Sequence, residues 1–259
     1  MKMKPIFILI PYWMGDFSPG RAAVARHTWR LITPPLPEAA PTERMGALCQ
    51  VIAQEVAAIR ATDHLPVVIG GDCTHAIGVL AGLQQETPDL TLVWYDAHGD
   101  FNTHETTPSG FIGGMPLAMV CGRGEQTIVQ GAGAKIQPEA DVILTDGRDL
   151  DPGEAEAVVA SDITHVPEVA GLAALSLPDK PIYAHFDSDV LRLEDLAAVN
   201  YPAEGGPSLE TIQASLAYLA DTGRIAAISV TMWDPDLDAD GSADRVVMNL
   251  IEQWVERLS

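Results

Sequence analysis

The sequence predicts an α/β protein in which helices cover both faces of a single, mostly parallel sheet. Two observations predict this class. Short, continuously apolar segments alternate with longer segments of helical periodicity along the whole chain. The apolar segments lack the polar residue at every second position that a half-exposed strand shows, so both of their faces are expected to be buried. The length of 259 residues suits one large domain, and we expect a single domain over residues 1–259.

The expected strands are apolar and lie at residues 5–10, 65–69, 91–96, 141–144, 181–187 and 224–230. The expected helices have apolar residues at i, i+3 and i+4 and lie at 43–61, 74–85, 208–220 and 242–258, with Thr42 as the expected cap of the first. Residues 34–37 and 149–171 are rich in loop formers and too short to separate domains. Because crossovers between parallel strands are right-handed, all strand carboxyl ends meet at one edge, where functional groups of such sheets collect.

The chain is strongly acidic, with 36 Asp and Glu against 15 Lys and Arg and a formal net charge of −21. Nucleic acid and anionic membranes are therefore excluded as default partners, since both require a basic surface. No run of about 18 apolar residues is present, so no membrane-spanning segment is predicted. Three cysteines without a CxxC pair predict neither a disulfide framework nor a zinc knuckle, and a reducing cytoplasm is the expected location.

Two clusters of carboxylates follow strands that are expected to be buried. Asp96, His98 and Asp100 occupy alternate positions at the end of one strand, and Asp187 and Asp189 do so at the end of another. Alternate residues of an extended segment point the same way, so each cluster converges beyond its strand. Four carboxylates that face one another repel unless a cation lies between them. Oxygen ligands with a histidine suit a divalent ion such as Mn²⁺, and this set is large enough for two ions.

The alternative interpretation is structural, because an Asp at a strand end commonly caps the next helix and a lone histidine is often only a hydrogen-bond donor. A third segment, residues 70–75, is glycine-rich but lacks the Lys-Ser/Thr of a phosphate-binding loop, so a nucleotide site is not expected. Cys73 and His75 of this segment could each supply a metal ligand. The alternative for Cys73 is a small, buried apolar group.

These segments carry a family resemblance that extends over nearly the whole chain. They are residues 70–78 (GGDCTHAIG), 96–103 (DAHGDFNT) with 107–110 (TPSG), 147–154 (GRDLDPGE) and 186–189 (FDSD). In order and spacing they resemble the metal and substrate motifs of the ureohydrolase family, which includes arginase, agmatinase and formiminoglutamase. The resemblance implies a three-layer α/β/α fold with a mostly parallel central sheet, and a hydrolase that acts on linear amidine carbon–nitrogen bonds.

The resemblance also implies a centre of two Mn²⁺ ions in which a bridging hydroxide attacks the guanidino carbon of an arginine-like amino acid and releases urea or hydroxyurea. Asp96 and Asp187 would bridge the ions. The full ligand set would be Cys73, Asp96, His98, Asp100, Asp187 and Asp189.

The amino-acid end of the substrate is assigned by the same resemblance. Asn102 and Ser109 match positions that hold an α-carboxylate, while Asp151 matches one that pairs with an α-ammonium and Glu154 assists through water. Their joint presence favours an amino acid over agmatine, which has no α-carboxylate. The alternative for Asp151 is the N-cap of a helix that begins at Pro152.

Four residues depart from the arginase pattern. Cys73 replaces a histidine ligand, Phe111 an asparagine that grips the substrate, Gly113 a histidine that carries protons, and Met232 a glutamate that pairs with the guanidinium. A guanidinium buried against methionine lacks its charge partner, whereas an N-hydroxyguanidine can enter neutral. The chain therefore resembles the branch with Cys for His that includes N-hydroxyarginine amidinohydrolase.

His104 or His75 is expected to take over the proton transfer that Gly113 cannot perform; a structural role for either histidine is the alternative. Two other functions stay open at this point, a formimino-amino-acid hydrolase of the same fold and a non-catalytic metal-binding relative. The expected partner is a small guanidino substrate. A homo-oligomer is also possible, since relatives form trimers and hexamers.

Overall fold

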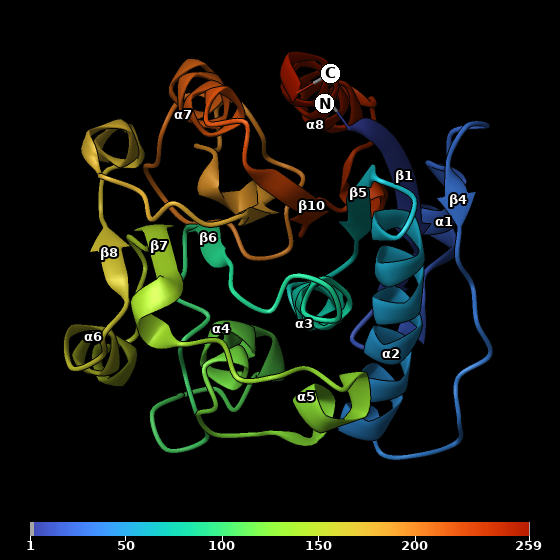
Figure 1. Ribbon diagram of the computed structural model, residues 1–259, viewed down its shortest axis with the longest axis horizontal. Coiled ribbons are helices and arrows are strands. Elements are labelled where there is room, and N and C mark those ends of the chain that lie inside the picture. The colour runs from blue at the N-terminus through green and yellow to red at the C-terminus, as the bar shows by residue number, and fades with distance from the viewer. Residues whose placement is uncertain (1–2, 259) are drawn as a thin grey trace.

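A computed structural model of the chain describes residues 3–258. Within them, eight strands form one sheet in which every neighbouring pair runs parallel (Figure 1). The mostly parallel sheet is therefore confirmed. In sheet order the strands are β4 (Arg30–Leu31), β1 (Lys4–Ile10), β5 (His64–Gly70), β10 (Ile225–Thr231), β9 (Ile182–Asp187), β6 (Thr91–Asp96), β7 (Val142–Asp146) and β8 (Thr164–Val166).

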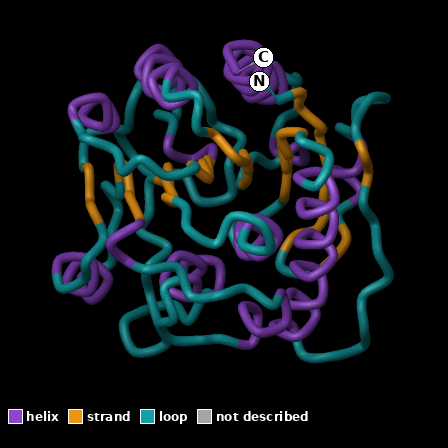
Figure 2. Tube along the Cα trace, viewed as in Figure 1, coloured by secondary structure: helices purple, strands orange, loops and turns teal. Residues whose placement is uncertain are grey.

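Helices cover both faces of the sheet, which confirms the three-layer α/β/α fold (Figures 1 and 2). One face carries α7 (Leu209–Asp221) and α8 (Ser242–Leu258), and the other carries α2 (Pro41–Arg60), α3 (His75–Leu83), α4 (Pro116–Val120), α5 (Thr127–Ala132) and α6 (Pro152–Val159). The shorter elements are α1 (Pro19–Ala23), the hairpin of β2 (Tyr12–Trp13) and β3 (Asp16–Phe17), and the 3-10 helices η1 (Ile112–Gly114), η2 (Glu139–Asp141), η3 (Val169–Ala174), η4 (Ser188–Val190) and η5 (Pro235–Leu237). Between residues 3 and 258, no helix has both the length and the apolarity needed to cross a lipid bilayer.

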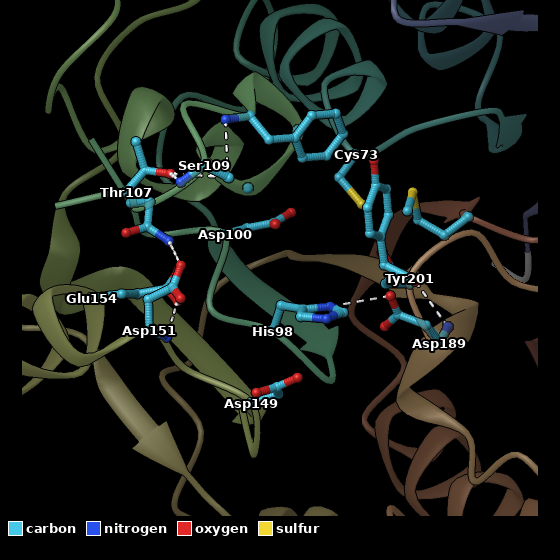
Figure 3. A pocket seen from close by; sticks show the side chains of 16 residues that line it. Cys73, His98, Asp100, Thr107, Ser109, Asp149, Asp151, Glu154, Asp189 and Tyr201 are labelled. Atoms are coloured by element: carbon cyan, nitrogen blue, oxygen red, sulfur yellow. Dashed lines mark hydrogen bonds and ion pairs between the residues drawn. The ribbon is translucent and has the colours of Figure 1, made fainter. Parts of the chain in front are cut away.

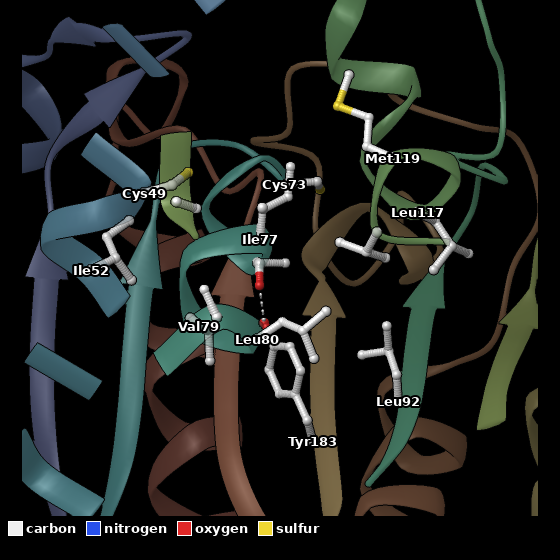
Figure 4. Close-up of a cluster of buried hydrophobic side chains, with 14 of the residues drawn as sticks. Cys49, Ile52, Cys73, Ile77, Val79, Leu80, Leu92, Leu117, Met119 and Tyr183 are labelled. Carbon is white, nitrogen blue, oxygen red and sulfur yellow. Dashed lines mark hydrogen bonds between the residues drawn. The ribbon is translucent and has the colours of Figure 1, made fainter. Parts of the chain in front are cut away.

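The apolar core consists of two clusters, one on each face of the sheet. On one face, Cys49 and Ile52 of α2 pack with Ile77 and Leu80 of α3 (Figure 4). On the other face, the helices α7 and α8 contribute most of the side chains that cover the sheet. Every residue of β6, β9 and β10 is buried. This double burial explains why the central strands read as continuous apolar runs.

The predicted cap of the first long helix is wrong. α2 begins at Pro41 after an N-cap at Ala40, so Thr42 already lies inside the first turn. Proline is favoured at this first position, because its fixed φ is helical and its missing N–H has no partner there. Residues 149–171, which are rich in loop formers, also contain α6 and β8. β8 and the edge strand β4 have three and two residues, too few to show a periodic pattern.

The carboxyl ends of β5, β10, β9, β6 and β7 lie next to one another at one edge of the sheet, because these strands are parallel neighbours. The chain turns sharply where it leaves them. Asp100, Asp146 and Met232 lie at or just beyond these ends and have φ angles of 48°, 76° and 67°. Left-handed backbone at non-glycine residues costs energy and is concentrated at functional sites. A functional site is therefore expected at this edge of the sheet.

Candidate metal centre and active site

A pocket of about 410 Å³ opens at this edge of the sheet (Figure 3). Its floor is formed by residues that follow β5, β6 and β9, and its walls by the loops after β6, β7, β9 and β10. The side chains that line it are those of Cys73, His98, Asp100, Asn102, Thr107, Ser109, Phe111, Asp149, Asp151, Glu154, Asp187, Asp189, Tyr201 and Met232, with Gly113 and Gly114. No Lys or Arg is among these described lining residues, although several carboxylates are.

The first group of possible ligands is Cys73, Asp96 and Asp187, whose ligand atoms all lie within 4.8 Å of one another. All three side chains are buried. The Cys73 thiol donates to Asp187 Oδ2 at 2.8 Å, and its Sγ lies 3.2 Å from the Thr231 hydroxyl. Burial, and then the charge of Asp187, raises the pKa of Cys73 well above its ordinary value. One sulfur and two carboxylates thus lie close together, although they come from the carboxyl ends of three different strands.

The second group is Asp96, His98 and Asp189, again with ligand atoms within 4.8 Å of one another. His98 Nδ1 lies 3.4 Å from Asp96 Oδ1 and 3.2 Å from Asp189 Oδ2. Burial by itself lowers the pKa of His98, but hydrogen bonds to Asp189 and Asp96 outweigh it and raise the value to about 12. Asp96 belongs to both groups, so the two groups share one carboxylate.

Asp100 lines the pocket beside these groups but is a member of neither. It is buried, and its Oδ2 has no hydrogen-bond partner among the described residues. Burial, followed by the charge of Asp96, raises its pKa well above the ordinary value. The pKa values of Asp96 and Asp187 are raised by burial and then by the charge of Asp189. Mutually repelling, buried carboxylates with an unused oxygen fit cations as the missing partners.

A polar group lies on one side of the pocket, where α6 begins. Asn102 Nδ2 donates to Asp151 Oδ2 at 3.0 Å, and both residues line the pocket. Glu154 accepts hydrogen bonds from the backbone N–H groups of Phe101 at 2.8 Å and Asp151 at 3.2 Å, so it ties the loop after β6 to this helix. Burial raises the pKa of Glu154 to about 7. Asp151 is also the N-cap residue of α6, so the same residue begins the helix and lines the pocket.

The two histidines that were expected to transfer protons do not line the pocket. His104 is exposed and is not among the residues that line it. His75 is buried and is also absent from the lining of this pocket, and its Nδ1 accepts the Gly71 N–H at 3.2 Å. Burial lowers the pKa of His75 and so favours its neutral form. These positions argue against proton transfer by either side chain at this pocket.

Four pocket residues, Thr107, Gly114, Asp149 and Tyr201, were not predicted as site residues from the sequence. Asp149 lies within the segment 147–154, and its position between the strand end and the helix start was the available signal. Tyr201 comes from a loop far along the chain and lies on the side of the pocket away from Asp151 and Glu154 (Figure 3). No local pattern marks it. Its position depends on how that loop returns to the sheet edge.

Met232 completes the wall beside Cys73. It directly follows β10, is buried, and adopts a left-handed φ of 67°. Its backbone N–H donates to the Gly71 carbonyl at 3.2 Å, which joins the turns after β10 and β5. An uncharged thioether therefore borders the acidic floor.

Comparison with known proteins gives matches over most of the chain. The arginase family model matches residues 22–255. The arginase of Bacillus subtilis (strain 168) is 33% identical over 214 residues, which cover 78% of this chain and 72% of that protein. The N(omega)-hydroxy-L-arginine amidinohydrolase of Streptomyces lavendulae is 36% identical over 132 residues, which cover 50% of this chain and 46% of that protein. A crystal structure of Bacillus subtilis arginase superimposes with a TM-score of 0.82 at 27% identity, covering 97% of this chain and 98% of that one.

Proposed function

The chain belongs to the arginase family and is a hydrolase of amidine carbon–nitrogen bonds, and from this premise we propose that its pocket hydrolyses the guanidino group of an arginine-like amino acid. One observation carries the proposal. Two groups of possible metal ligands share the buried Asp96, and their other members, Cys73, His98, Asp187 and Asp189, line a pocket that also contains a polar group suited to an amino acid. The guanidino carbon would lie over the shared carboxylate, and the α-substituents would lie at the start of α6.

The donor set supports a centre of two divalent cations, for which we propose Mn²⁺. The ligands would be Cys73, Asp96, His98, Asp100, Asp187 and Asp189. When bound, the cations would lower the pKa of a water molecule and so supply the nucleophile that attacks the guanidino carbon. Hard carboxylate oxygens suit Mn²⁺, whereas a thiolate is soft and favours Zn²⁺ or Co²⁺ more than a histidine would.

The polar side of the pocket would bind the amino-acid end of the substrate. The carboxylates of Asp151 and Glu154 would face the α-ammonium, while the Asn102 amide and the Ser109 hydroxyl would donate to the α-carboxylate. The hydrogen bond from Asn102 to Asp151 fixes both groups before the substrate arrives. Preorganised partners of this kind reduce the ordering that binding requires.

The charge of the guanidino end favours N-hydroxyarginine over arginine. Met232 cannot pair with a guanidinium, and a buried cation without a partner is costly. An N-hydroxyguanidine is less basic and can bind in its neutral form. The Streptomyces relative is named for this substrate. The reaction on it would release hydroxyurea and ornithine.

The test is a substrate panel with purified, Mn²⁺-loaded protein. Arginine, N-hydroxyarginine, agmatine and formiminoglutamate are compared, with urea, hydroxyurea and formamide as measured products. We expect the highest kcat/KM for N-hydroxyarginine, and we expect Asp96→Asn to abolish turnover while the exposed control Asp179→Asn retains it. Faster release of urea from arginine contradicts the proposed substrate. Release of formamide alone, or no turnover with two metals bound, contradicts guanidino hydrolysis itself.

A further inference from the structure

Two aromatic side chains meet at the wall of the pocket. The rings of Phe111 and Tyr201 lie 4.9 Å apart between centroids and are tilted by 41°. Both residues line the pocket, although they belong to loops that are far apart in the sequence. Tyr201 remains 42% exposed, so its ring lies at the mouth instead of in the core. Exposed aromatic rings that line a pocket are typical of groups that contact a ligand.

The Phe111 ring lies over the backbone of Gly113. A Cβ atom placed on Gly113 would lie 2.4 Å from the ring, which is closer than atoms can approach, so the ring occupies the space of a side chain at position 113. The Phe111 backbone N–H also donates to Ser109 Oγ at 3.2 Å. Phe111 is therefore held next to a residue of the proposed amino-acid subsite.

Tyr201 is presented by a loop that is held on both sides. Before it, Asn200 Nδ2 donates to Asp234 Oδ2 at 2.6 Å. After it, Arg148 donates to the carbonyls of Ala203 at 3.2 Å and Glu204 at 3.0 Å. The same guanidinium donates to the carbonyls of Asp189 and Val190, both at 3.1 Å. Arg148 thus holds both the loop that carries Tyr201 and the segment that contains the proposed metal ligand Asp189.

The rings are apolar, whereas the side of the pocket formed by Asp151 and Glu154 is acidic (Figure 3). A substrate that reaches from the start of α6 to the shared carboxylate of Asp96 must place its methylene chain between its two polar ends. Phe111 lies beside the subsite for one end, and Tyr201 is tied to the ligand loop at the other. The methylene chain is the part of the substrate that an aromatic wall stabilises.

We propose that Phe111 and Tyr201 form an aromatic clasp that packs on the methylene chain of the substrate and sets the chain length that the site accepts. The preferred ligands are α-amino acids with the three methylenes of arginine. This proposal rests on the proposed function, because it takes the positions of the two polar ends from it. The specificity resides in the rings, and the Tyr201 hydroxyl is not required.

The test compares wild type, Tyr201→Ala and Tyr201→Phe in the Mn²⁺-loaded protein. The substrates are N-hydroxyarginine and its homologues that are one methylene shorter and one longer. Tyr201→Ala is expected to raise KM for N-hydroxyarginine about three- to tenfold with a small change in kcat, and to reduce the preference over both homologues by a similar factor. Tyr201→Phe keeps the ring and is expected to keep the wild-type preference for N-hydroxyarginine over both homologues. Phe17→Ala, which removes a ring of similar exposure (49%) outside the pocket, is the matched control.

Binding of ornithine and lysine, measured by calorimetry on the same proteins, separates this proposal from the proposed function. A wild type without turnover rejects the function, and the ratio of the two dissociation constants then tests the clasp alone. An unchanged ratio in Tyr201→Ala overturns the clasp, as does the absence of binding. A loss of preference in Tyr201→Phe as large as in Tyr201→Ala assigns the effect to the hydroxyl and also overturns it.

Discussion

In the proposed function, Met232 is the residue that selects the charge of the guanidino group. Its side chain borders the acidic floor, it is buried, and its backbone is held in a left-handed conformation. A glutamate is unbranched at Cβ like methionine and has a similar volume, so it can occupy the same backbone and space. The difference between the two side chains is therefore almost entirely one of charge.

Met232→Glu is expected to shift the preference toward arginine. The new carboxylate pairs with a guanidinium, so the ratio of kcat/KM for arginine to that for N-hydroxyarginine should rise by about ten- to a hundredfold. Steady-state kinetics with both substrates measure this ratio. Leu237→Glu adds the same charge at an exposed position and serves as the control. An unchanged ratio in Met232→Glu, with metal content equal to wild type, would show that charge at this position does not select the substrate.

Cys73 is the residue whose chemistry the metal would change most. Its Sγ lies between Asp187 and the Thr231 hydroxyl and is buried. Substitution with Co²⁺ should therefore produce a sulfur-to-cobalt absorption band in the near ultraviolet. In Cys73→Ser we expect the band to disappear and metal affinity to fall at least about tenfold. Cys121→Ala removes a buried thiol outside the pocket and should keep the band. A band that survives in Cys73→Ser excludes the thiolate ligand.

Arg148 joins two loops at the carboxyl edge of the sheet, the one after β7 and the one after β9. It pairs with Asp146 at the end of β7 and donates to carbonyls of η4, which follows β9, and of residues 203 and 204 further along the same connection. The guanidinium reaches these acceptors together because its donors form a planar fork. A lysine has the same charge but cannot make this set of hydrogen bonds.

Arg148→Lys is expected to loosen the loop that carries Tyr201. Hydrogen exchange should increase at residues 199–206, and the free energy of unfolding should fall by about 2 kcal/mol, because hydrogen bonds from a charged donor are lost. Exchange mass spectrometry and chemical denaturation measure the two effects. Arg192→Lys changes an exposed ion pair with Asp195 and should be neutral. Equal exchange in wild type and Arg148→Lys would remove the guanidinium as the anchor.

The predictability of the elements follows from their burial and length. The central strands were predicted because burial on both faces leaves a continuous apolar sequence, and the ligand candidates were brought together because parallel strands end at one edge. The edge strands were missed because they are short. Tyr201 was missed because long-range hydrogen bonds from Arg148 place it, and such contacts leave no local pattern. The single domain, the cytoplasmic location and a homo-oligomer stay predictions.

The molecule as a whole carries its acidic groups in two very different environments. The chain has 36 acidic side chains and a net charge of −21. Four of the 36, Asp96, Asp100, Asp187 and Asp189, are concentrated in one buried site, and the others lie elsewhere in the molecule. Two divalent ions would change the formal charge from −21 to −17 by neutralising that site. The stability of the entire fold should therefore respond to metal and to pH through these few groups.

Mn²⁺ is expected to raise the melting temperature relative to the chelated protein, and by more at pH 7.5 than at pH 5.5. The pKa values of Asp96, Asp100 and Asp187 are raised by burial and then by neighbouring charges, so the folded state holds their protons more tightly than the unfolded chain. Without metal, stability is thus present at low pH and declines as pH rises through the raised values. Bound cations replace those protons, and a gain of about 5 to 10 °C corresponds to metal near a hundred times its dissociation constant.

Differential scanning calorimetry with Mn²⁺ or a chelator at the two pH values measures this gain. Asp96→Asn removes the carboxylate that both ligand groups share and should abolish most of it. Exposed Asp179→Asn should leave it intact. A gain that is absent, or that shrinks as pH rises, would show that these carboxylates do not bind the metal.

The contact between Phe111 and Gly113 couples the effects of substitutions at these two positions. With the ring in place, any side chain at 113 begins 2.4 Å from an aromatic carbon. Gly113→His made alone therefore displaces the ring, and its phenotype reports the loss of that wall instead of the gain of a proton carrier. Replacing Phe111 by a smaller residue in the same variant removes this clash. A library that explores position 113 should therefore vary position 111 together with it.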